Sequence, residues 1–393
     1  MSIVIVGAGQ AAAQLVLSLR QGGCKDTIRM IGDEPYAPYQ RPPLSKKFLT
    51  ARPAAETLYF RPENFWREQG VAADYGVSVT AIDRVGKRVT FKGGHADYAT
   101  LFLSTGTRAR AIPLPGAELA GVFSLRKIDD VRRLRGPLDA AKSVVIVGGG
   151  YIGLEVAAVA RGEGRAVTVL EAEDRVMKRV TSPVISTFMQ DFHRNRGVDI
   201  RLGARLAGIE GDAIGGEAKV AQVWLADGTA LPADLVLLAV GAKPNDDLAA
   251  AAGIVCEDGV VVDEHGRTSD PAIYAAGDCT RFPSRRYGRK LRLECVQNAI
   301  DQAKAVAAEI LGKPQHYDPV PWFWSDQYEL KLQMAGLSEG YDDATTVGDV
   351  AAARFSVEYR KGGRLIAVDA VNDGRAYMSG RKRIAEETAQ ASS

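Results

Sequence analysis

Residues 143–171, with the sequence SVVIVGGGYIGLEVAAVARGEGRAVTVLE, contain the pattern that decides the fold. An apolar run leads into a glycine-rich turn that begins at Gly148, and an Ala-rich stretch then leads to a second β-branched run that ends at Glu171. This is the strand, turn, helix and strand of a dinucleotide-binding βαβ unit. Gly148 permits the tight turn, Gly150 lets the backbone approach a pyrophosphate at the helix N-terminus, and Gly153 lets helix and strand pack closely. Glu171 lies 23 residues after Gly148, where an acid can reach an adenosine ribose.

A second copy of this pattern begins the chain. Residues 3–6 lead into Gly7-Ala8-Gly9-Gln10-Ala11-Ala12, an apolar helix and a strand over 28–31, after which Asp33 supplies the acid. Ala12 replaces the third glycine, which the fingerprint allows. One such match is weak, because glycine-rich turns also form for steric reasons. Two complete units about 140 residues apart predict two dinucleotide sites.

Length and composition indicate an ordinary globular protein of two or three domains. The chain has 393 residues, of which 46% are hydrophobic and 25% charged, and its formal net charge is +2. No apolar run approaches the roughly 20 residues of a membrane helix. Because the first strand begins at Ile3, we expect no signal peptide and a cytoplasmic protein.

Cysteine and histidine spacings predict neither a disulfide framework nor a metal site. Cys24, Cys256, Cys279 and Cys295 form no CxxC pair, and the chain's four histidines, His95, His193, His265 and His316, show no ligand spacing. We expect reduced, buried thiols and no metal.

A proline-rich segment over 34–46 follows the first βαβ unit. We predict a rigid, non-helical stretch in which Ser45 caps a helix beginning at Lys46. Arg41 and Lys46 would then be held near a phosphate-binding turn, although two solvated loop charges would give the same pattern.

Two buried strands that each end in glycine, over 101–106 and 235–241, mark crossings between domains. The first continues into a Pro-rich stretch over 108–115 that lacks a strand pattern. The predicted class is therefore α/β, with one Rossmann-like domain inserted in another. We assign residues 1–110 and 245–315 to the first nucleotide domain, 111–244 to the second, and 316–393 to a small α+β domain whose tail frays from about Glu386.

The return to the first domain contains a short strand over 273–278 that ends in Asp278, and a helix over 296–311. Asp278 is placed to accept a ribityl or phosphate-side hydroxyl, or simply to cap this region. Between these elements, residues 281–292 carry six cations and no acid in a run that looks like a loop.

These residues resemble the FAD-dependent, NADH-using ferredoxin reductases of bacterial oxygenase systems, of the putidaredoxin reductase and biphenyl-dioxygenase type. The resemblance covers essentially the whole chain. Its most specific pieces are RPPLSK at 41–46, VVIVGGGYIGLEVA at 144–157, TSDPAIYAAGDC at 268–279 and PWFWSDQYELKLQMAGLSEGYD at 321–342. It implies two Rossmann-like domains, for FAD and NAD, and a C-terminal interface domain.

The resemblance also implies site residues. The FAD contacts fall on Gly7, Gly9, Ala11, Asp33, Arg41, Lys46, Val79, Arg126, Asp278, Val296 and Trp324. The NAD contacts fall on Gly148, Gly150, Tyr151, Ile152, Gly153, Glu155, Glu171 and Gly241. Lys46 and Glu155 would lie beside the flavin and the nicotinamide as an ion pair and serve as the catalytic residues.

The implied reaction is hydride transfer from NADH to FAD, followed by single-electron release to a two-iron, two-sulfur ferredoxin. That ferredoxin would supply a haem monooxygenase or a ring-hydroxylating dioxygenase. We predict that Arg285, Arg286, Arg289 and Lys290 of the basic run dock the acidic partner, against the alternative of a solvated loop face.

Competing flavoenzyme functions differ in their cysteines. Disulfide reductases need a CxxC near the first helix, and NADH oxidases or peroxidases need a single cysteine where this chain has Leu44-Ser45-Lys46. Rubredoxin reductase and monodehydroascorbate reductase need none and remain open. A signalling flavoprotein like apoptosis-inducing factor also remains open, although the targeting segment and the large insertion of those proteins are not seen in this sequence.

Overall fold

The computed structural model describes residues 2–214 and 217–391. They fall into two compact units. Unit 1 comprises Met1–Gln40, Ala54–Arg108 and Lys243–Pro319. Unit 2 comprises Arg41–Pro53, Ala109–Ala242 and Val320–Ser393. The proline-rich segment after Gln40 thus packs with unit 2, as does the C-terminal region.

Unit 1 is built on a five-stranded parallel sheet with the order β19-β7-β1-β2-β3. Its strands are β1 (Ser2–Val6), β2 (Thr27–Gly32), β3 (Val71–Tyr75), β7 (Thr100–Leu103) and β19 (Ile273–Ala275). Register places Ile3 of β1 opposite Ile28 of β2 and Thr100 of β7. Because both faces of a parallel sheet are covered, β1 reads as a continuous apolar run.

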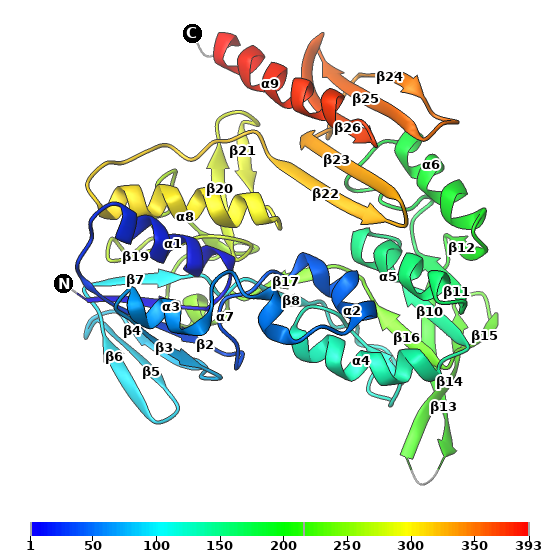
Figure 1. Cartoon of the computed structure of the whole chain (residues 1–393), viewed down its shortest axis with the longest axis horizontal. Helices are drawn as coiled ribbons and strands as arrows, with labels where there is room; N and C mark the ends of the chain where they lie inside the picture. The colour runs from blue at the N-terminus through cyan, green and yellow to red at the C-terminus, as the bar shows by residue number, and fades with distance from the viewer. Residues whose placement is uncertain (1, 215–216, 392–393) are drawn as a thin grey trace. The chain divides into compact units, whose positions relative to one another are not determined.

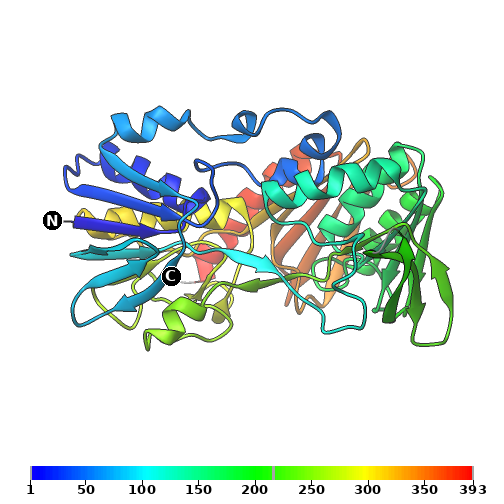
Figure 2. The ribbon, with the colours of Figure 1, turned by 90° about the horizontal axis from the view of Figure 1, so that it is seen from below.

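Helices α1 (Gln10–Gln21) and α8 (Val296–Ile310) lie side by side in Figure 1 and, seen from below, in Figure 2. Leu15 and Val306 from these helices and Trp66 from α3 (Glu63–Glu68) are fully buried with the sheet residues. This core fixes the N-terminus of α1 at the carboxyl end of β1, where an open parallel sheet binds ligands.

Smaller elements complete unit 1. They are η2 (Ala55–Leu58), α7 (Asp247–Ala251), β18 (Val260–Val261) and an antiparallel sheet of β4 (Val79–Asp83), β5 (Arg88–Phe91) and β6 (Gly94–Asp97). The charge run over residues 281–292 suggested a loop, and this prediction is wrong. β20 (Thr280–Ser284) and β21 (Arg289–Leu291) pair there as an antiparallel hairpin. Alternating burial of Thr280, Phe282 and Ser284 gives that run its strand character.

Unit 2 contains the second parallel sheet, in the order β12-β11-β10-β16-β9. The strands are β9 (Val122–Phe123), β10 (Ser143–Val147), β11 (Ala166–Glu171), β12 (Val198–Leu202) and β16 (Leu235–Leu238). Helices α4 (Ile128–Ala140), α5 (Tyr151–Gly162) and α6 (Pro183–Arg194) and the antiparallel strands β13 (Leu206–Ile214), β14 (Glu217–Leu225) and β15 (Ala230–Pro232) accompany it. The predicted α/β class with two βαβ units is confirmed.

The first crossing differs from the prediction in one respect. The chain between the two parallel sheets was expected to lack strand structure after residue 107, but β8 (Thr107–Ala109) pairs there with β17 (Ala242–Pro244). Backbone hydrogen bonds available to any two extended segments, rather than side-chain periodicity, make this short pair.

The proline-rich segment also departs from the prediction. Residues 42–45 form the 3-10 helix η1 (Pro42–Ser45), and α2 (Lys47–Ala51) begins without a side-chain cap. Ser45 therefore caps no helix, because its hydroxyl bonds a distant carboxylate instead.

The C-terminal region of unit 2 is an antiparallel sheet in the order β22-β23-β26-β25-β24. Its strands are β22 (Trp322–Gln327), β23 (Leu330–Gly336), β24 (Asp343–Asp349), β25 (Arg354–Lys361) and β26 (Arg364–Val371). The expected frayed tail from Glu386 is wrong, because α9 (Gly374–Ala391) continues through that position (Figure 1). Tyr377 and Ile384 of α9 are buried with Leu365 and Val368 of β26, and this contact holds the helix.

Candidate functional site

The first glycine of each turn is required by the protein itself. Gly7 and Gly148 have φ angles of +104° and +107°. A Cβ at Gly7 would lie 2.3 Å from the Ser104 carbonyl oxygen, and one at Gly148 would lie 2.4 Å from that of Ala239. Each glycine therefore allows the strand to turn sharply against a neighbouring strand end.

No backbone angle or contact within the protein requires glycine at the second position of each turn. Gly9 and Gly150 precede α1 and α5 with extended backbones, at φ −101° and −83°. A Cβ built on either would meet no protein atom within 4 Å. Space is thus kept open beside two helix N-termini whose first N–H groups have no side-chain cap. This is the cradle that a pyrophosphate requires, so the residues present fit a dinucleotide at each turn.

The third position differs between the turns. A Cβ at Gly153 would lie 2.0 Å from the carbonyl oxygen of Gly148, so α5 packs directly on the turn. Ala12 occupies the corresponding place in α1 and is fully buried. Helix α1 therefore lies far enough from its glycine-rich turn to leave room for the methyl group of Ala12.

The acid at the end of the second βαβ unit, Glu171, accepts hydrogen bonds from the backbone of its own turn. Glu171 accepts hydrogen bonds from the backbone N–H groups of Gly149 at 2.8 Å and Glu173 at 2.9 Å. Arg175, which could pair with a 2′-phosphate, instead donates to the Thr181 carbonyl at 2.8 Å and the Ser186 hydroxyl at 2.6 Å. Glu171 thus presents a carboxylate close to the turn, and the nearby guanidinium is turned to other partners.

The acid at the end of the first βαβ unit, Asp33, is followed by a buried glutamate, Glu34. Asp33 follows β2 and is exposed, whereas Glu34 is 9% exposed and accepts a hydrogen bond from the Tyr39 hydroxyl at 2.5 Å. The exposed carboxylate at the strand end is the one that a ribose could reach.

A buried carboxylate at Glu155 brings together residues from three separate segments of unit 2. Glu155 is 5% exposed, and its Oε2 lies 2.7 Å from Lys46 Nζ. Ser45 Oγ donates to the same oxygen at 2.5 Å, and Ser325 Oγ of β22 donates to Oε1 at 2.7 Å. The predicted pairing of Lys46 with Glu155 is therefore observed, and both carboxylate oxygens are satisfied.

The hydrogen bonds continue away from Glu155 into α6. Gln327 Nε2 donates to Ser325 Oγ at 3.1 Å, and Gln327 Oε1 lies 2.8 Å from His193 Nε2. His193 is fully buried, and burial lowers the pKa of its imidazole, which is therefore neutral. Its Nδ1 atom has no hydrogen-bond partner among the described residues. A continuous series of hydrogen bonds thus links the Lys46–Glu155 pair to α6.

Sequence reasoning missed Ser325, Gln327 and His193 as members of this network. Ser325 and Gln327 alternate along β22 and are each 1% exposed. Small polar side chains two apart in a strand flanked by aromatic residues were the available signal.

The remaining predicted contacts divide between the units. Unit 1 holds Gly7, Gly9, Ala11, Asp33, Val79, Asp278 and Val296. Unit 2 holds Arg41, Lys46, Arg126, Trp324 and all predicted NAD contacts, namely Gly148, Gly150, Tyr151, Ile152, Gly153, Glu155, Glu171 and Gly241. Within unit 2, Arg41 donates to the Arg126 carbonyl at 3.0 Å, and the Tyr151 ring lies 4.5 Å from that of Phe323, which precedes Trp324.

The predicted docking residues lie on the β20–β21 hairpin, where acids from other segments face the cations. Lys290 Nζ is 3.1 Å from Glu257, and an Arg285 guanidinium nitrogen is 3.7 Å from Glu264. Arg286 and Arg289 lie on the same hairpin. The run of like charge in the sequence is thus partly neutralised in space.

Thiols are poorly suited to chemistry here. All four cysteines are free. The expectation of buried thiols holds for Cys279 alone, because Cys24, Cys256 and Cys295 are half-buried. Burial raises the pKa of Cys256 to about 11 and that of Cys295 to about 12, so both are protonated at neutral pH. None of the helices within residues 2–214 and 217–391 has both the length and the apolar character needed to cross a bilayer.

Comparison with known proteins agrees with this geometry. Residues 1–303 match the family model described as pyridine nucleotide-disulphide oxidoreductase, and residues 322–393 match the reductase C-terminal model. Putidaredoxin reductase from Pseudomonas putida is 44% identical over 94% of this chain and 88% of its own length. Rhodocoxin reductase from Rhodococcus erythropolis is 43% identical over 98% of this chain and 90% of its own length.

Solved structures give the same result. The covalent putidaredoxin reductase–putidaredoxin complex contains a chain with a TM-score of 0.94 and 42% identity, covering 98% of this chain and 93% of that one. The predicted resemblance is confirmed. The chain belongs to the pyridine nucleotide-disulphide oxidoreductase family and, within it, to the flavin- and pyridine nucleotide-dependent ferredoxin reductases with a reductase C-terminal domain.

Proposed function

We propose that this chain binds FAD at the turn that begins with Gly7 and NADH at the turn that begins with Gly148, and passes electrons to a two-iron, two-sulfur ferredoxin. The ferredoxin supplies a haem monooxygenase or a ring-hydroxylating dioxygenase. A bound FAD would supply the redox chemistry, since it accepts a hydride from NADH and gives up electrons singly. The protein supplies binding, orientation and electrostatics.

The observation that carries this proposal is the open space at Gly9 and Gly150. Neither residue needs to be glycine for its backbone angles or for contacts within the protein. Both lie at uncapped helix N-termini, where a helix dipole favours an anion. Two pyrophosphates, one in each unit, explain both glycines.

The Lys46–Glu155 pair has the position and burial of a catalytic element. Glu155 is one helical turn from the turn glycines of α5, on the element that would carry NADH. Its three partners hold the carboxylate in one orientation. We assign Lys46 and Glu155 to the alignment of the reacting rings and to the electrostatics around them.

NADH is preferred over NADPH in this proposal. Glu171 would accept hydrogen bonds from the ribose hydroxyls, and a 2′-phosphate would place like charge beside it. Arg175 would have to abandon its hydrogen bonds to Thr181, Ser186 and Lys178 to compensate.

The β20–β21 hairpin is proposed as the ferredoxin-docking surface. Arg285 is the most promising member, because its side chain is 74% exposed and its acidic neighbour Glu264 is 3.7 Å away. Steering by such charges raises association rates by about 10- to 1000-fold and fades as salt shortens the Debye length.

A spectrophotometric screen of NADH-driven reduction tests the proposal. The FAD-loaded full chain is assayed with two-iron, two-sulfur ferredoxins from the same genome, with a rubredoxin and with monodehydroascorbate. We expect rapid reduction of at least one ferredoxin and slow NADH oxidation without an acceptor. Faster turnover with rubredoxin or monodehydroascorbate than with every ferredoxin would contradict the proposed partner.

The docking surface has a matched control. Arg285→Glu, Arg286→Glu and Arg289→Glu together should raise the KM for the ferredoxin, while NADH-to-ferricyanide turnover stays near wild type. Arg364→Glu makes the same kind of charge change at the exposed start of β26 and should leave the KM unchanged. An equal effect of both substitutions, or a KM independent of salt, would contradict docking at the hairpin.

A further inference from the structure

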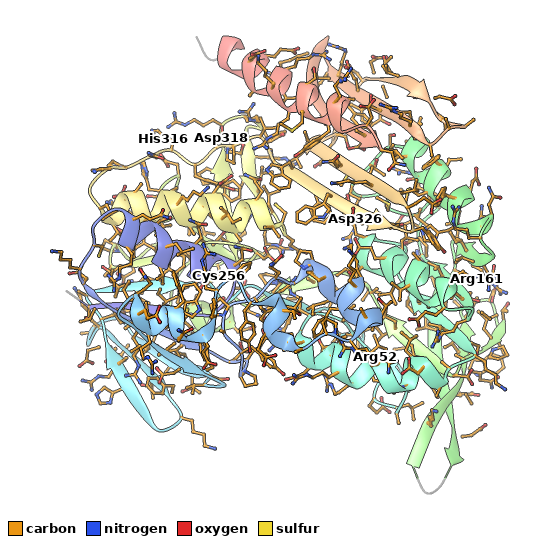
Figure 3. The ribbon with its side chains drawn as sticks, in the orientation of Figure 1. Arg52, Arg161, Cys256, His316, Asp318 and Asp326 are labelled. Atoms are coloured by element: carbon orange, nitrogen blue, oxygen red, sulfur yellow. The ribbon has the colours of Figure 1, made fainter. Side chains whose placement is uncertain are left out.

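Three metal-ligating side chains meet in unit 1, far from both glycine-rich turns in sequence. Glu264, His265 and His316 place one ligand atom each within 4.8 Å of the others. The two imidazole rings lie 5.0 Å apart, inclined by 36°. Glu264 and His265 belong to the turn after β18. His316, labelled in Figure 3, belongs to the segment after α8.

The backbone around this cluster is already organised. Asp263 Oδ1 accepts hydrogen bonds from the N–H groups of His265 and Arg267, both at 2.9 Å, which closes the turn. The N–H of Tyr317 donates to the Glu264 carbonyl at 3.0 Å, which holds the second segment beside it. A metal would therefore find its ligands in place at little conformational cost.

His265 has the outer partners typical of a metal-bound imidazole. Its Nδ1 lies 3.3 Å from the Gln315 carbonyl and 3.6 Å from Glu309 Oε2. The Glu309 side chain is only 8% exposed and pairs with Arg267. Metal-ligating histidines commonly donate one ring N–H to a carboxylate or carbonyl, which leaves the other nitrogen to bind the metal.

We propose that Glu264, His265 and His316 form a binding site for a divalent transition metal of the zinc class, with water completing its coordination. Two imidazoles and one carboxylate suit Zn²⁺, Co²⁺ or Ni²⁺, whereas Mg²⁺ and Ca²⁺ take oxygen ligands. The sequence predicted no metal because its spacing rules apply to ligands close together in the chain. Here His316 comes 51 residues after His265.

One cation competes for the site. An Arg285 guanidinium nitrogen lies 3.7 Å from Glu264 Oε1, and the Arg285 side chain is 74% exposed. Arg285 can move into solvent when a metal takes its place.

Such a metal would join the turn after β18 to the segment that leads from α8 toward β22. That segment is also held by Asp318, which accepts from Ser284 Oγ at 2.6 Å and from the backbone N–H of Arg286 at 3.0 Å. The site is therefore structural in character, and it adjoins the proposed docking surface through Arg285.

Isothermal titration calorimetry of the untagged, FAD-loaded full chain with ZnCl₂ tests this site, with MgCl₂ titrated in parallel. We expect one Zn²⁺ per chain and no heat from Mg²⁺. His265→Ala/His316→Ala should abolish Zn²⁺ binding, and Glu264→Gln should weaken it. Glu309→Gln should weaken it by about 10- to 100-fold, as loss of an outer partner does. Arg285→Ala should tighten it.

His95→Ala is the matched control, because His95 is an exposed histidine of β6 in the same unit. It should leave Zn²⁺ affinity unchanged. Flavin content and the melting temperature without metal show whether each variant is folded, and Zn²⁺ should raise the melting temperature of the wild type but not of the double variant. Undiminished Zn²⁺ binding by folded His265→Ala/His316→Ala, an equal loss in His95→Ala, or equal binding of Mg²⁺ would each overturn the proposal.

Discussion

The two glycine-rich turns share a backbone design and differ in what their helices carry. Gly7 and Gly148 turn under the same constraint, and Gly9 and Gly150 both keep open space beside a helix N-terminus. The third glycine survives only in the second turn. Near it, a buried glutamate stands in α5 where α1 has Gln14.

The features that both turns share serve ligand binding, whereas the glutamate found only in α5 serves the reaction. The features common to both turns are those that a pyrophosphate needs, whichever dinucleotide is bound. Gln14 donates to Ser18 within its own helix at 3.0 Å. Glu155 instead collects partners from the proline-rich segment and from β22. The second helix is thus specialised to hold a fixed charge next to its ligand, and the first is not.

The largest expected effect comes from removing that charge. Glu155→Gln leaves Lys46 without its counter-charge at a site where the lysine side chain is 19% exposed. Removal of one member of a buried pair costs about 3 to 5 kcal/mol, and we expect the lower end here because Lys46 retains some solvent. Urea unfolding should show this loss together with a lower kcat for NADH-to-ferricyanide turnover.

Gln14→Ala is the corresponding change in the first helix. It removes a half-buried hydrogen bond within the helix and should cost no more than about 0.5 kcal/mol. Equal losses from the two substitutions would show that the two helices are not specialised as described.

Exchange of the third residue should give the next largest effect. Gly153→Ala puts a methyl group 2.0 Å from the Gly148 carbonyl oxygen, and such overpacking costs about 1 to 3 kcal/mol. Because the turn itself must move, the KM for NADH should also rise. The reverse change, Ala12→Gly, costs about 1 kcal/mol through helix propensity and should leave flavin content intact. A normal KM for NADH in Gly153→Ala would mean that close packing of α5 is unnecessary.

Substitution of the second glycine in one turn should weaken binding of that turn's ligand only, and the stability of the apoprotein should not change. A methyl group at Gly9 or Gly150 meets no protein atom within 4 Å, so both variants should unfold at the wild-type urea concentration in the apoprotein. Loss of a hydrogen bond to a charged phosphate costs about 1.5 to 3 kcal/mol. Gly9→Ala should therefore lower flavin content, and Gly150→Ala should raise the KM for NADH. The opposite assignment of effects would reverse the proposed ligands.

Local patterns predicted the fold well because each βαβ unit is written in contiguous residues. Glycine spacing, β-branched runs and a terminal acid occur within 29 residues of one another in 143–171. The Lys46–Glu155 pair could be expected only through family resemblance. Ser325, a further partner of Glu155, lies 170 residues from it in the chain, and no periodicity reports such a contact.

The failures have the same origin. The six cations of residues 281–292 looked unopposed because Glu257, Asp258 and Glu264 lie outside that run. The C-terminal residues looked polar enough to fray, but burial of Ile384 against β26 outweighs their composition. In both cases tertiary contacts decided what a window of sequence could not show.

The smallest expected effect concerns the choice between NADH and NADPH at the second turn. Glu171 ends β11 and accepts from two backbone N–H groups, so it both shapes the turn and presents negative charge near the ribose. Glu171→Gln keeps most of the shape and removes the charge. We expect the ratio of kcat/KM for NADH to that for NADPH to fall by about 10-fold, which corresponds to about 1.4 kcal/mol. Arg175→Ala is the control, because its guanidinium is bound to Thr181 and Ser186 and should contribute nothing to phosphate recognition. If Arg175→Ala lowered kcat/KM for NADPH alone, the arginine would be serving the 2′-phosphate, and the ribose preference would have to be assigned to it rather than to Glu171.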